Sequence, residues 1–254
     1  MNALWHNRAV PISSGVPDVP RTRPAILVAA THSGAGKTTA VAILLRLLRR
    51  QGLTVQAFKI GPDFIDPAYH AEATGRAAIN LDLWMMGADG VQRAFDTYSA
   101  DADISVIEAM GALFDGADGS GTGSAAHLAK LLRVPVVVVL DVWGMTRTAG
   151  ALLAGIRDFD PDLDIAGYLL NRTGSPTHAR MVLDSLPPAL RKLVIGTIPR
   201  RSELVVPERH LGLVTIEENA RSRAERDAAY QLAGADLDVN LLLAAAGHRP
   251  GQTA

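Results

Sequence analysis

Three short segments carry residue types that could bind a polyphosphate and transfer a phosphoryl group. They are SGAGKTT at residues 33–39, KIGPDFID at residues 59–66, and the acid that ends the apolar run ISVIE at residues 104–108. Lysine and backbone N–H groups offset phosphate charge, and carboxylate and hydroxyl oxygens are the ligands that Mg²⁺ prefers. Together these segments predict a site for a nucleotide and a divalent ion.

The segment at residues 33–39 has the pattern of a phosphate-binding loop. Gly34 and Gly36 carry no Cβ, so the surrounding N–H groups can point at a ligand, and the helix that follows adds its positive end. We expect Lys37 at the terminal phosphates and Thr38 on Mg²⁺. The full pattern has a glycine five residues before Gly36, where this chain has Thr31, so a ligand-free glycine-rich connection is the alternative. The expected ATP-binding residues of this loop are Ser33, Gly34, Ala35, Gly36, Lys37, Thr38 and Thr39.

Acidic residues follow two further apolar runs. Glu108 ends the run at residues 104–108, and Asp63 and Asp66 follow Lys59, which closes the run at residues 55–59. Ligands of doubly wound sheets collect at the carboxyl ends of the strands, so we expect Asp63 in the metal shell beside Thr38 and Glu108. Asp66 would face the second substrate. An ordinary turn is the alternative, because Gly, Pro and Asp are the commonest turn residues.

The positions of these residues depend on an alternation of apolar runs and helical stretches. This alternation indicates an α/β fold with a doubly wound, mostly parallel sheet of the P-loop NTPase type. The expected strands are 25–30, 55–59, 104–108, 136–141, 165–171 and 193–198, and the expected helices are about 36–51, 88–100, 124–132, 146–157, 176–186, 217–233 and 237–246. A flexible leader at 1–24, one domain at 25–247 and a tail at 248–254 complete the expected organisation.

The composition excludes several classes of protein. With 25 basic and 26 acidic residues scattered along the chain, a nucleic-acid partner is not expected. No segment has the length of a membrane span or a signal sequence, so we expect a cytoplasmic protein without a membrane partner. The absence of cysteine excludes a cysteine nucleophile and a thiolate metal site in this chain.

Longer motifs carry a resemblance to a known family. The runs FKIGPDFIDPAYHAEATGRAAINLDLWMMG, IEAMGALFDG, GSAAHLAKLL, LLNRTGSPTH and VPERHLGL, together with SGAGKTT, resemble the synthetase domain of the cobyrinic and hydrogenobyrinic acid a,c-diamide synthases. That domain is similar to dethiobiotin synthetase. The similarity runs from about residue 26 to residue 214.

The resemblance implies an ATP-dependent ligase of the carbon–nitrogen class, with ATP and Mg²⁺ as cofactors. A carboxylate of a corrinoid acid would attack the γ-phosphate of ATP, and ammonia would then displace phosphate to leave an amide, at the a and c acetate side chains. The implied catalytic residues are Lys37, Lys59, Asp63, Asp66, Glu108 and Asp115, with Thr38, Asp63 and Glu108 as the metal ligands. Asn171 resembles the position that recognises adenine, with Arg172 beside it. The implied substrate-binding residues are Phe64, Tyr69, His70, Arg76, Asn80, Asp82 and Trp84. For His70 a structural hydrogen bond is an equal alternative, and Trp84 is a candidate for core packing together with Met85 and Met86.

The chain also departs from the family. The 254 residues stop before the glutaminase domain that normally follows, so we expect ammonia from a separate glutaminase subunit or from solution, or another amine, or else a chain that is only part of a longer product. The sequence reads EAMGALFDG where the family has EGVMGLFDG, and Ala125 and Phe64 stand where hydroxyl residues are common. The alternatives are therefore a stand-alone ligase acting on a non-corrinoid acid, a degenerate subunit, or a partition-type ATPase switch. Against the switch, the second lysine of that class is missing from AATHSGAGK. A homodimer is expected from the wider group.

Overall fold

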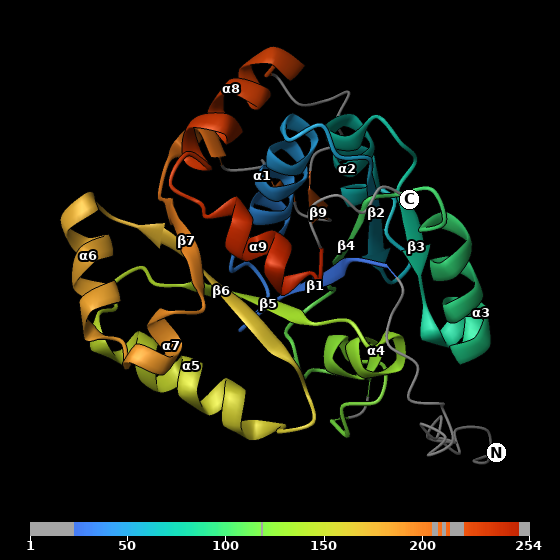
Figure 1. Cartoon of the computed structure of the whole chain (residues 1–254), viewed down its shortest axis with the longest axis horizontal. Helices are drawn as coiled ribbons and strands as arrows, with labels where there is room; N and C mark the ends of the chain where they lie inside the picture. Colours follow the sequence, from blue (N-terminus) through green and yellow to red (C-terminus); the bar gives the residue numbers. More distant parts are fainter. Residues whose placement is uncertain (1–22, 118, 205–207, 210–211, 214–220, 249–254) are drawn as a thin grey trace.

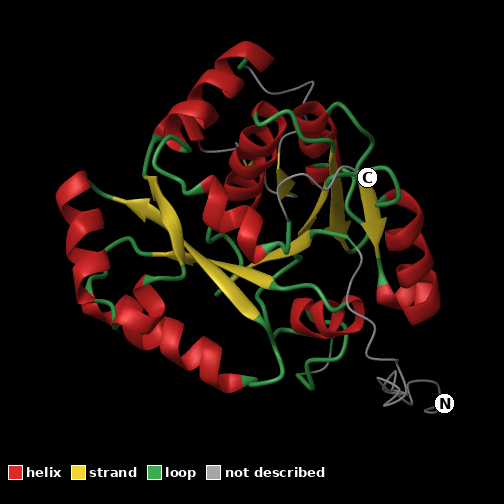
Figure 2. Ribbon diagram, in the orientation of Figure 1, coloured by secondary structure: helices red, strands yellow, loops and turns green. Residues whose placement is uncertain are grey.

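The protein forms three layers, with a central sheet between two groups of helices (Figures 1 and 2). The structure is a computed structural model that describes residues 23–117, 119–204, 208–209, 212–213 and 221–248. The expected leader at 1–24 and tail at 248–254 therefore lie almost entirely outside the described residues. Within the described part of the chain, no helix combines the length and apolarity needed to cross a bilayer.

The central sheet contains seven strands in the order β3-β2-β4-β1-β5-β6-β7, and every neighbouring pair is parallel. The strands are β1 (Ala25–Ala30), β2 (Val55–Ile60), β3 (Ile79–Leu81), β4 (Ile104–Glu108), β5 (Val136–Asp141), β6 (Ile165–Thr173) and β7 (Val194–Pro199). A separate antiparallel pair is formed by β8 (Glu208–Arg209) and β9 (Gly212–Leu213). The expected doubly wound sheet is confirmed, and its order reverses at β1. Ligands of such sheets bind at this point.

Helices cover both faces of the sheet. One face packs against α1 (Lys37–Arg50), α8 (Arg223–Ala233) and α9 (Val239–Ala245), and α2 (Asp66–Thr74) lies beside α1 (Figure 1). The other face packs against α3 (Leu83–Tyr98), α4 (Ala125–Leu132), α5 (Arg147–Phe159), α6 (Pro176–Ser185) and α7 (Pro188–Arg191). A short 3₁₀ helix, η1, spans Ser202–Leu204.

The strands are apolar along their whole length because both of their faces are buried. In β1, Ile26 and Val28 pack in the core beneath α1, whereas Leu27 and Ala29 pack in the core on the opposite face. All six residues of β1 are buried. The loop that follows β1 is therefore attached to a strand that is buried along its whole length.

Helix α1 begins differently from most of the other long helices. Side chains cap the N-termini of α3, α4, α6, α8 and α9, and the capping residues are Asp82, Ser124, Ser175, Ser222 and Asp238. Gly36 precedes α1 in a left-handed conformation, with no side-chain cap and no acidic residue in the first turn. The first N–H groups of an α-helix have no intrahelical partner. Those of α1 remain available to an anionic ligand.

The expectations for one segment and for the packing of two side chains are wrong. The segment after β2, expected as a loop, forms α2 from Asp66, with Pro67 in its first turn and left-handed Gly75 at its end. Proline is well suited to the first turn of a helix, so the turn-forming composition was misleading. The short elements β3 and α7 were not predicted. Trp84 and Met85, candidates for packing, are 72% and 74% exposed.

Candidate functional site

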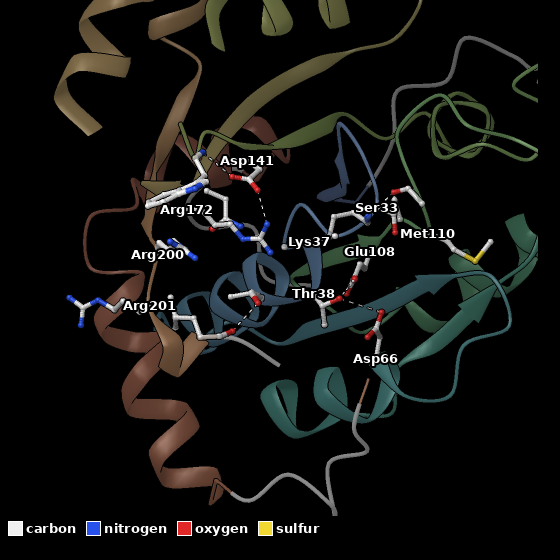
Figure 3. Close-up of a pocket in the computed structure, with 18 of the residues that line it drawn as sticks. Ser33, Lys37, Thr38, Asp66, Glu108, Met110, Asp141, Arg172, Arg200 and Arg201 are labelled. Carbon is white, nitrogen blue, oxygen red and sulfur yellow. Dashed lines mark hydrogen bonds and ion pairs between the residues drawn. The ribbon is translucent and has the colours of Figure 1, made fainter. Parts of the chain in front are cut away.

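One cavity of about 500 Å³ opens at the carboxyl ends of the strands (Figure 3). The loops that follow β1, β4, β5 and β7 contribute to it, together with the ends of β2 and β6 and the start of α2. Eleven of the expected site residues line this cavity: Ser33, Gly34, Gly36, Lys37, Thr38, Thr39, Lys59, Asp66, Glu108, Asn171 and Arg172. The structure therefore brings the glycine-rich loop and the acidic segments together, as the sequence predicts.

A side chain of β6 forms a hydrogen bond with the glycine-rich loop. The Asn171 side-chain amide donates a hydrogen bond of 2.7 Å to the carbonyl oxygen of Ala35. Gly36 has a φ of 90°, and a Cβ at this position would lie 2.2 Å from Nδ2 of Asn171. Only glycine fits both the backbone conformation and this close approach. Asn171, expected at the adenine, thus contacts the loop itself while lining the cavity.

Lys37 lies deep in the cavity. Its Nζ donates a hydrogen bond of 2.6 Å to the carbonyl oxygen of Gly111, in the loop after β4. Burial lowers the pKa of Lys37, and the carboxylate of Glu108 offsets part of that effect. Next to it, the Thr39 hydroxyl donates to the carbonyl oxygen of Leu204 at 3.1 Å, which ties α1 to the 3₁₀ helix.

A buried cluster of charged groups forms the other wall. Glu108 and His70 are fully buried, and Lys59 is 4% exposed. Lys59 Nζ lies 3.1 Å from Oε1 of Glu108 and donates a hydrogen bond to Asp66. His70 Nε2 lies 2.6 Å from Oε2 of Glu108, and the Thr38 hydroxyl donates to Oε1 at 2.8 Å. Glu108 therefore joins the phosphate loop to β2 and α2.

The cluster shifts the pKa values of its own members. Burial alone would raise the pKa of Glu108, but Lys59 and the hydrogen bond from His70 hold it well below its usual range. Burial and the charge of Glu108 raise the pKa of Asp66 to about 6, although Lys59 opposes them. Burial acts to lower the pKa of Lys59, yet Glu108 and Asp66 raise it above its ordinary value. Lys59 and Glu108 thus stay charged at neutral pH.

The cluster also contains a carboxylate oxygen that is free to bind a metal ion. Oδ1 of Asp66 is buried and has no hydrogen-bond partner among the described residues, while Oδ2 accepts from the Thr38 hydroxyl at 3.4 Å. A hydroxyl and two carboxylates at this spacing suit Mg²⁺, which usually keeps further oxygen ligands from water and phosphate. In the described part of the chain, no group of three or more His, Asp or Glu side chains could hold a metal ion. A nucleotide would have to complete the shell.

Asp63 occupies a different position from the expected one. Its Oδ1 accepts hydrogen bonds from the backbone N–H groups of Ile65 and Asp66, at 2.8 and 3.2 Å, and its Oδ2 lies 3.7 Å from Nζ of Lys59. Asp66, not Asp63, stands beside Thr38. The turn explains why Asp66 rather than Asp63 lies beside Thr38. The Asp63 carboxylate is occupied by hydrogen bonds from the backbone that leads into α2.

Asp115 is also displaced from the expected site. It is exposed and lines a second cavity, formed by the glycine-rich segment at residues 119–124 and the start of α4. It does not line the cavity that holds Lys37 and Glu108. The expectation that Asp115 lies with the catalytic acids is not met in this structure.

The expected substrate-binding residues divide into structural and exposed positions. Tyr69 is 1% exposed, and His70 is committed to Glu108. Asn80 donates to the carbonyl oxygen of Asp63 at 2.7 Å, and Asp82 caps α3. In this structure none of these four side chains lines the cavity, and each contacts other protein groups. A direct contact with substrate stays a prediction for them, and for His70 the structural hydrogen bond is present.

Arg76 lies at the wrong end of the sheet for a substrate contact. Its side chain pairs with Asp101 at 2.7 Å and donates to Oε1 of Gln56 at 3.1 Å. Gln56 is near the start of β2, whereas the cavity is at the carboxyl end. Phe64 and Trp84, in contrast, are 84% and 72% exposed at the carboxyl ends of β2 and β3.

Several lining residues were not anticipated from the sequence: Ala109, Met110, Gly111, Asp141, Trp143, Pro199, Arg200, Arg201 and Leu204. Asp141 ends β5, and the two arginines follow β7. The rule that ligands gather at the carboxyl ends of strands could have found these positions, since both strands were expected.

Comparisons with known proteins agree with this geometry. The profile of the family described as CobQ/CobB/MinD/ParA nucleotide binding domain matches residues 26–214. A cobyrinate a,c-diamide synthase from Leptospira interrogans is 41% identical over 228 residues, which are 89% of this chain and 50% of that protein. A hydrogenobyrinate a,c-diamide synthase from Stutzerimonas stutzeri is 44% identical over 221 residues, 87% of this chain and 50% of that protein. A cobyrinate a,c-diamide synthase from Syntrophotalea carbinolica is 46% identical over 195 residues, 76% and 42% of the two chains. This chain spans about half the length of these curated relatives.

Proposed function

Because the chain belongs to the CobQ/CobB/MinD/ParA nucleotide binding domain family, we propose that its cavity binds ATP with Mg²⁺ and uses them to convert carboxylates to amides. The substrate in this proposal is a corrinoid acid, cobyrinic or hydrogenobyrinic, amidated at its a and c acetate side chains. The names of the relatives, cobyrinate and hydrogenobyrinate a,c-diamide synthase, support this choice.

The observation that carries the proposal is that a phosphate loop and a buried acid cluster share one cavity. The uncapped start of α1 offers N–H groups and a positive helix end to phosphates. Thr38, Asp66 and Glu108 would hold the magnesium ion, and Asp66 has an oxygen to spare. When bound, the ion supplies positive charge that neutralises the phosphate oxygens.

In the first step, an oxygen of the substrate carboxylate attacks the γ-phosphorus of ATP and ADP leaves. Lys37 and the loop N–H groups stabilise the charge that develops on the transferred group. Lys59 holds Glu108 and Asp66 in place with its own charge. The product of this step is an acyl phosphate, a mixed anhydride that ammonia can attack.

In the second step, ammonia attacks the acyl carbon, the bond between that carbon and the phosphate oxygen breaks, and phosphate leaves. The nitrogen then loses a proton to give the neutral amide. The 254 residues contain no cysteine for glutamine hydrolysis by a cysteine nucleophile. We propose that a glutaminase outside these 254 residues, or free ammonia, supplies the nitrogen. We also propose that the enzyme acts as a homodimer.

The exposed apolar side chains near the cavity support a large, flat substrate. Phe64, Trp84 and Met85 are each more than two-thirds exposed, at 84%, 72% and 74%, and follow the adjacent strands β2 and β3. Met110, 55% exposed, lines the cavity. Exposed apolar clusters of this kind usually mark a binding surface. A macrocycle could cover them while one of its carboxylates enters the cavity.

The test is an incubation with MgATP, an ammonium salt and cobyrinic or hydrogenobyrinic acid, followed by mass spectrometry. We expect two successive losses of one mass unit, each replacement of a hydroxyl by an amino group accompanied by one ADP. ADP release with another carboxylic acid, without change in the corrinoid, would overturn the substrate proposal. No ADP release with any acid would overturn the ligase proposal.

A further inference from the structure

An indole ring forms part of the cavity wall far from the acid cluster. Trp143, in the loop after β5, is the one aromatic side chain among the described residues that line the cavity. It is 53% exposed, so a large part of its surface is open. The guanidinium carbon of Arg200, which follows β7, lies 4.1 Å from the centre of the ring.

Three contacts hold Trp143 in place. Its backbone N–H donates to Oδ1 of Asp141 at 2.9 Å, while Oδ2 of Asp141 accepts from Nη1 of Arg172 at 2.6 Å. Its ring packs against the backbone after β6, because a Cβ on Gly174 would lie 3.2 Å from Cζ3. The ends of β5, β6 and β7 are therefore joined into one rim by Trp143, Asp141, Arg172 and Arg200.

This rim faces the acid cluster across the phosphate loop. In Figure 3, Arg172, Arg200 and Arg201 lie on one side of Lys37 and Thr38, and Asp66 and Glu108 lie on the other. All of these residues line the same cavity. If the terminal phosphate meets the oxygens of the acid cluster, the ribose and base must extend towards the rim.

We infer that Trp143 and Arg200 form a stacking platform that holds the base of the nucleotide. This inference rests on the proposed function, since it names the part of the same cavity that recognises the nucleoside. An aromatic ring offers a base a flat apolar surface, and an arginine adds a cation–π contact. The platform favours purines, which stack over a larger area than pyrimidines.

An exposed tryptophan that does not contact the nucleotide is the alternative, and Trp84 provides the comparison. Trp84 is more exposed, at 72%, and does not line the cavity. Trp143, in contrast, is fixed by the carboxylate of Asp141 and covered on one face by Arg200. Such fixing is what a preorganised binding surface requires.

Tryptophan fluorescence tests the inference directly. The chain contains three tryptophans, so the double variant Trp5→Phe, Trp84→Phe leaves Trp143 as the single emitter. We expect MgADP to quench or shift this emission. Magnesium tripolyphosphate, which has no base, should bind to the same loop without changing it. Equal responses to the two ligands would contradict stacking on Trp143.

Calorimetry of single variants supplies the second readout. Trp143→Ala should weaken MgADP binding about tenfold, the usual loss of one base–aromatic stack, and Trp143→Phe should restore most of the affinity. Binding of magnesium tripolyphosphate should stay the same in both. Arg200→Gln, at an exposed position, is expected to weaken MgADP binding without affecting folding. Tyr98→Ala, at an exposed aromatic side chain on α3 that does not line the cavity, is the matched control.

Two negative outcomes are distinguishable. If the parent protein binds MgADP and Trp143→Ala binds it equally well, the inference is overturned while the proposed function stands. If the parent protein binds neither MgADP nor magnesium tripolyphosphate, the proposed function fails and the inference fails with it.

Discussion

At the scale of single residues, the site depends on charges that are expensive to bury. Lys59 and Glu108 are at most 4% exposed, and Asp66 is 5% exposed. An ion pair at such depth is seldom a net source of stability, because desolvation offsets the attraction. The cluster is better explained by function, since it positions oxygen atoms beside Thr38 and keeps Glu108 ionised.

Replacement of Lys37 by alanine tests the phosphate side of the cavity. We expect turnover to fall by about 10²–10³-fold, because the variant loses a group that stabilises charge in the transition state. The rate of ADP release with saturating MgATP measures it. Arg50→Ala, at the exposed far end of α1, is the control. A turnover in Lys37→Ala within a few-fold of the control would contradict the assignment.

The raised pKa of Asp66 predicts how stability depends on pH. Its pKa is about 6 in the folded protein, above the ordinary value of 3.8, so the folded state favours the protonated form. This contribution to stability is complete below pH 3.8 and is lost as the pH rises through about 6. Asp66→Asn removes the titration. Between pH 4 and pH 7 the wild type should therefore lose about 2 kcal/mol of unfolding free energy relative to the variant.

Urea unfolding of both proteins, without nucleotide and with a chelator present, provides this comparison. Any constant cost of losing the contact with Lys59 cancels, because Lys59 remains protonated throughout this range. A difference between the two proteins that is independent of pH would show that Asp66 does not titrate as described.

At the scale of elements, the sequence predicted long buried segments well and short ones poorly. The bounds of β1, β4 and β5 coincide with the expected ranges, because their apolar runs are continuous and sharply bounded. β3, at the sheet edge, has three residues and gave no periodic signal. In α3, Gly87 interrupts the helix with a φ of 66°, so only the part after it had a regular pattern.

The position of α2 depends on a buried ion network that links it to α1 and α8. Glu72 on α2 accepts from Nη2 of Arg46 at 3.3 Å and from Nη2 of Arg226 at 2.5 Å. Both arginines are at least nine-tenths buried, at 8% and 6% exposure. Since α2 begins with Asp66 and includes His70, this network also fixes the position of these two residues of the acid cluster.

We expect Glu72→Gln to lower the unfolding free energy by about 3–5 kcal/mol, because it removes the carboxylate that two buried guanidinium groups share. Arg46 keeps a second carboxylate partner in Asp227, whereas Arg226 loses its ion pair. Asp101→Asn is the matched control, since its side chain is 70% exposed. Loss of this surface pair with Arg76 should change the unfolding free energy far less, because solvent screens exposed ion pairs. Urea denaturation of the two variants compares them. Equal shifts of the two midpoints would show that the Glu72 network is energetically neutral.

At the scale of the whole molecule, the parallel sheet explains which part of the site was predictable. Lys37, Thr38 and Glu108 belong to local patterns, a loop and a strand end, that the sequence displays directly. The finding that Asp66, and not Asp63, lies beside Thr38 depends on the conformation of one turn, which the sequence pattern does not specify. Trp143 and Arg200 meet only because β5, β6 and β7 are neighbours in the sheet, which no local pattern reveals.

The whole molecule also places the parts needed for the proposed activation in one cavity. The phosphate loop, the acid cluster and the rim come from separate segments of the chain, and all of them line this cavity. The arrangement supports our proposal that a carboxylate is activated here by phosphoryl transfer.

The most direct test of this account follows the carboxylate oxygen. If a carboxylate attacks the γ-phosphorus, that oxygen bridges carbon and phosphorus and leaves with phosphate when ammonia attacks. With ¹⁸O in the corrinoid carboxylates, MgATP and ammonium, we predict that each amide formed releases one phosphate carrying one ¹⁸O, measured by mass spectrometry. Unlabelled phosphate accompanying amide formation would contradict activation through an acyl phosphate.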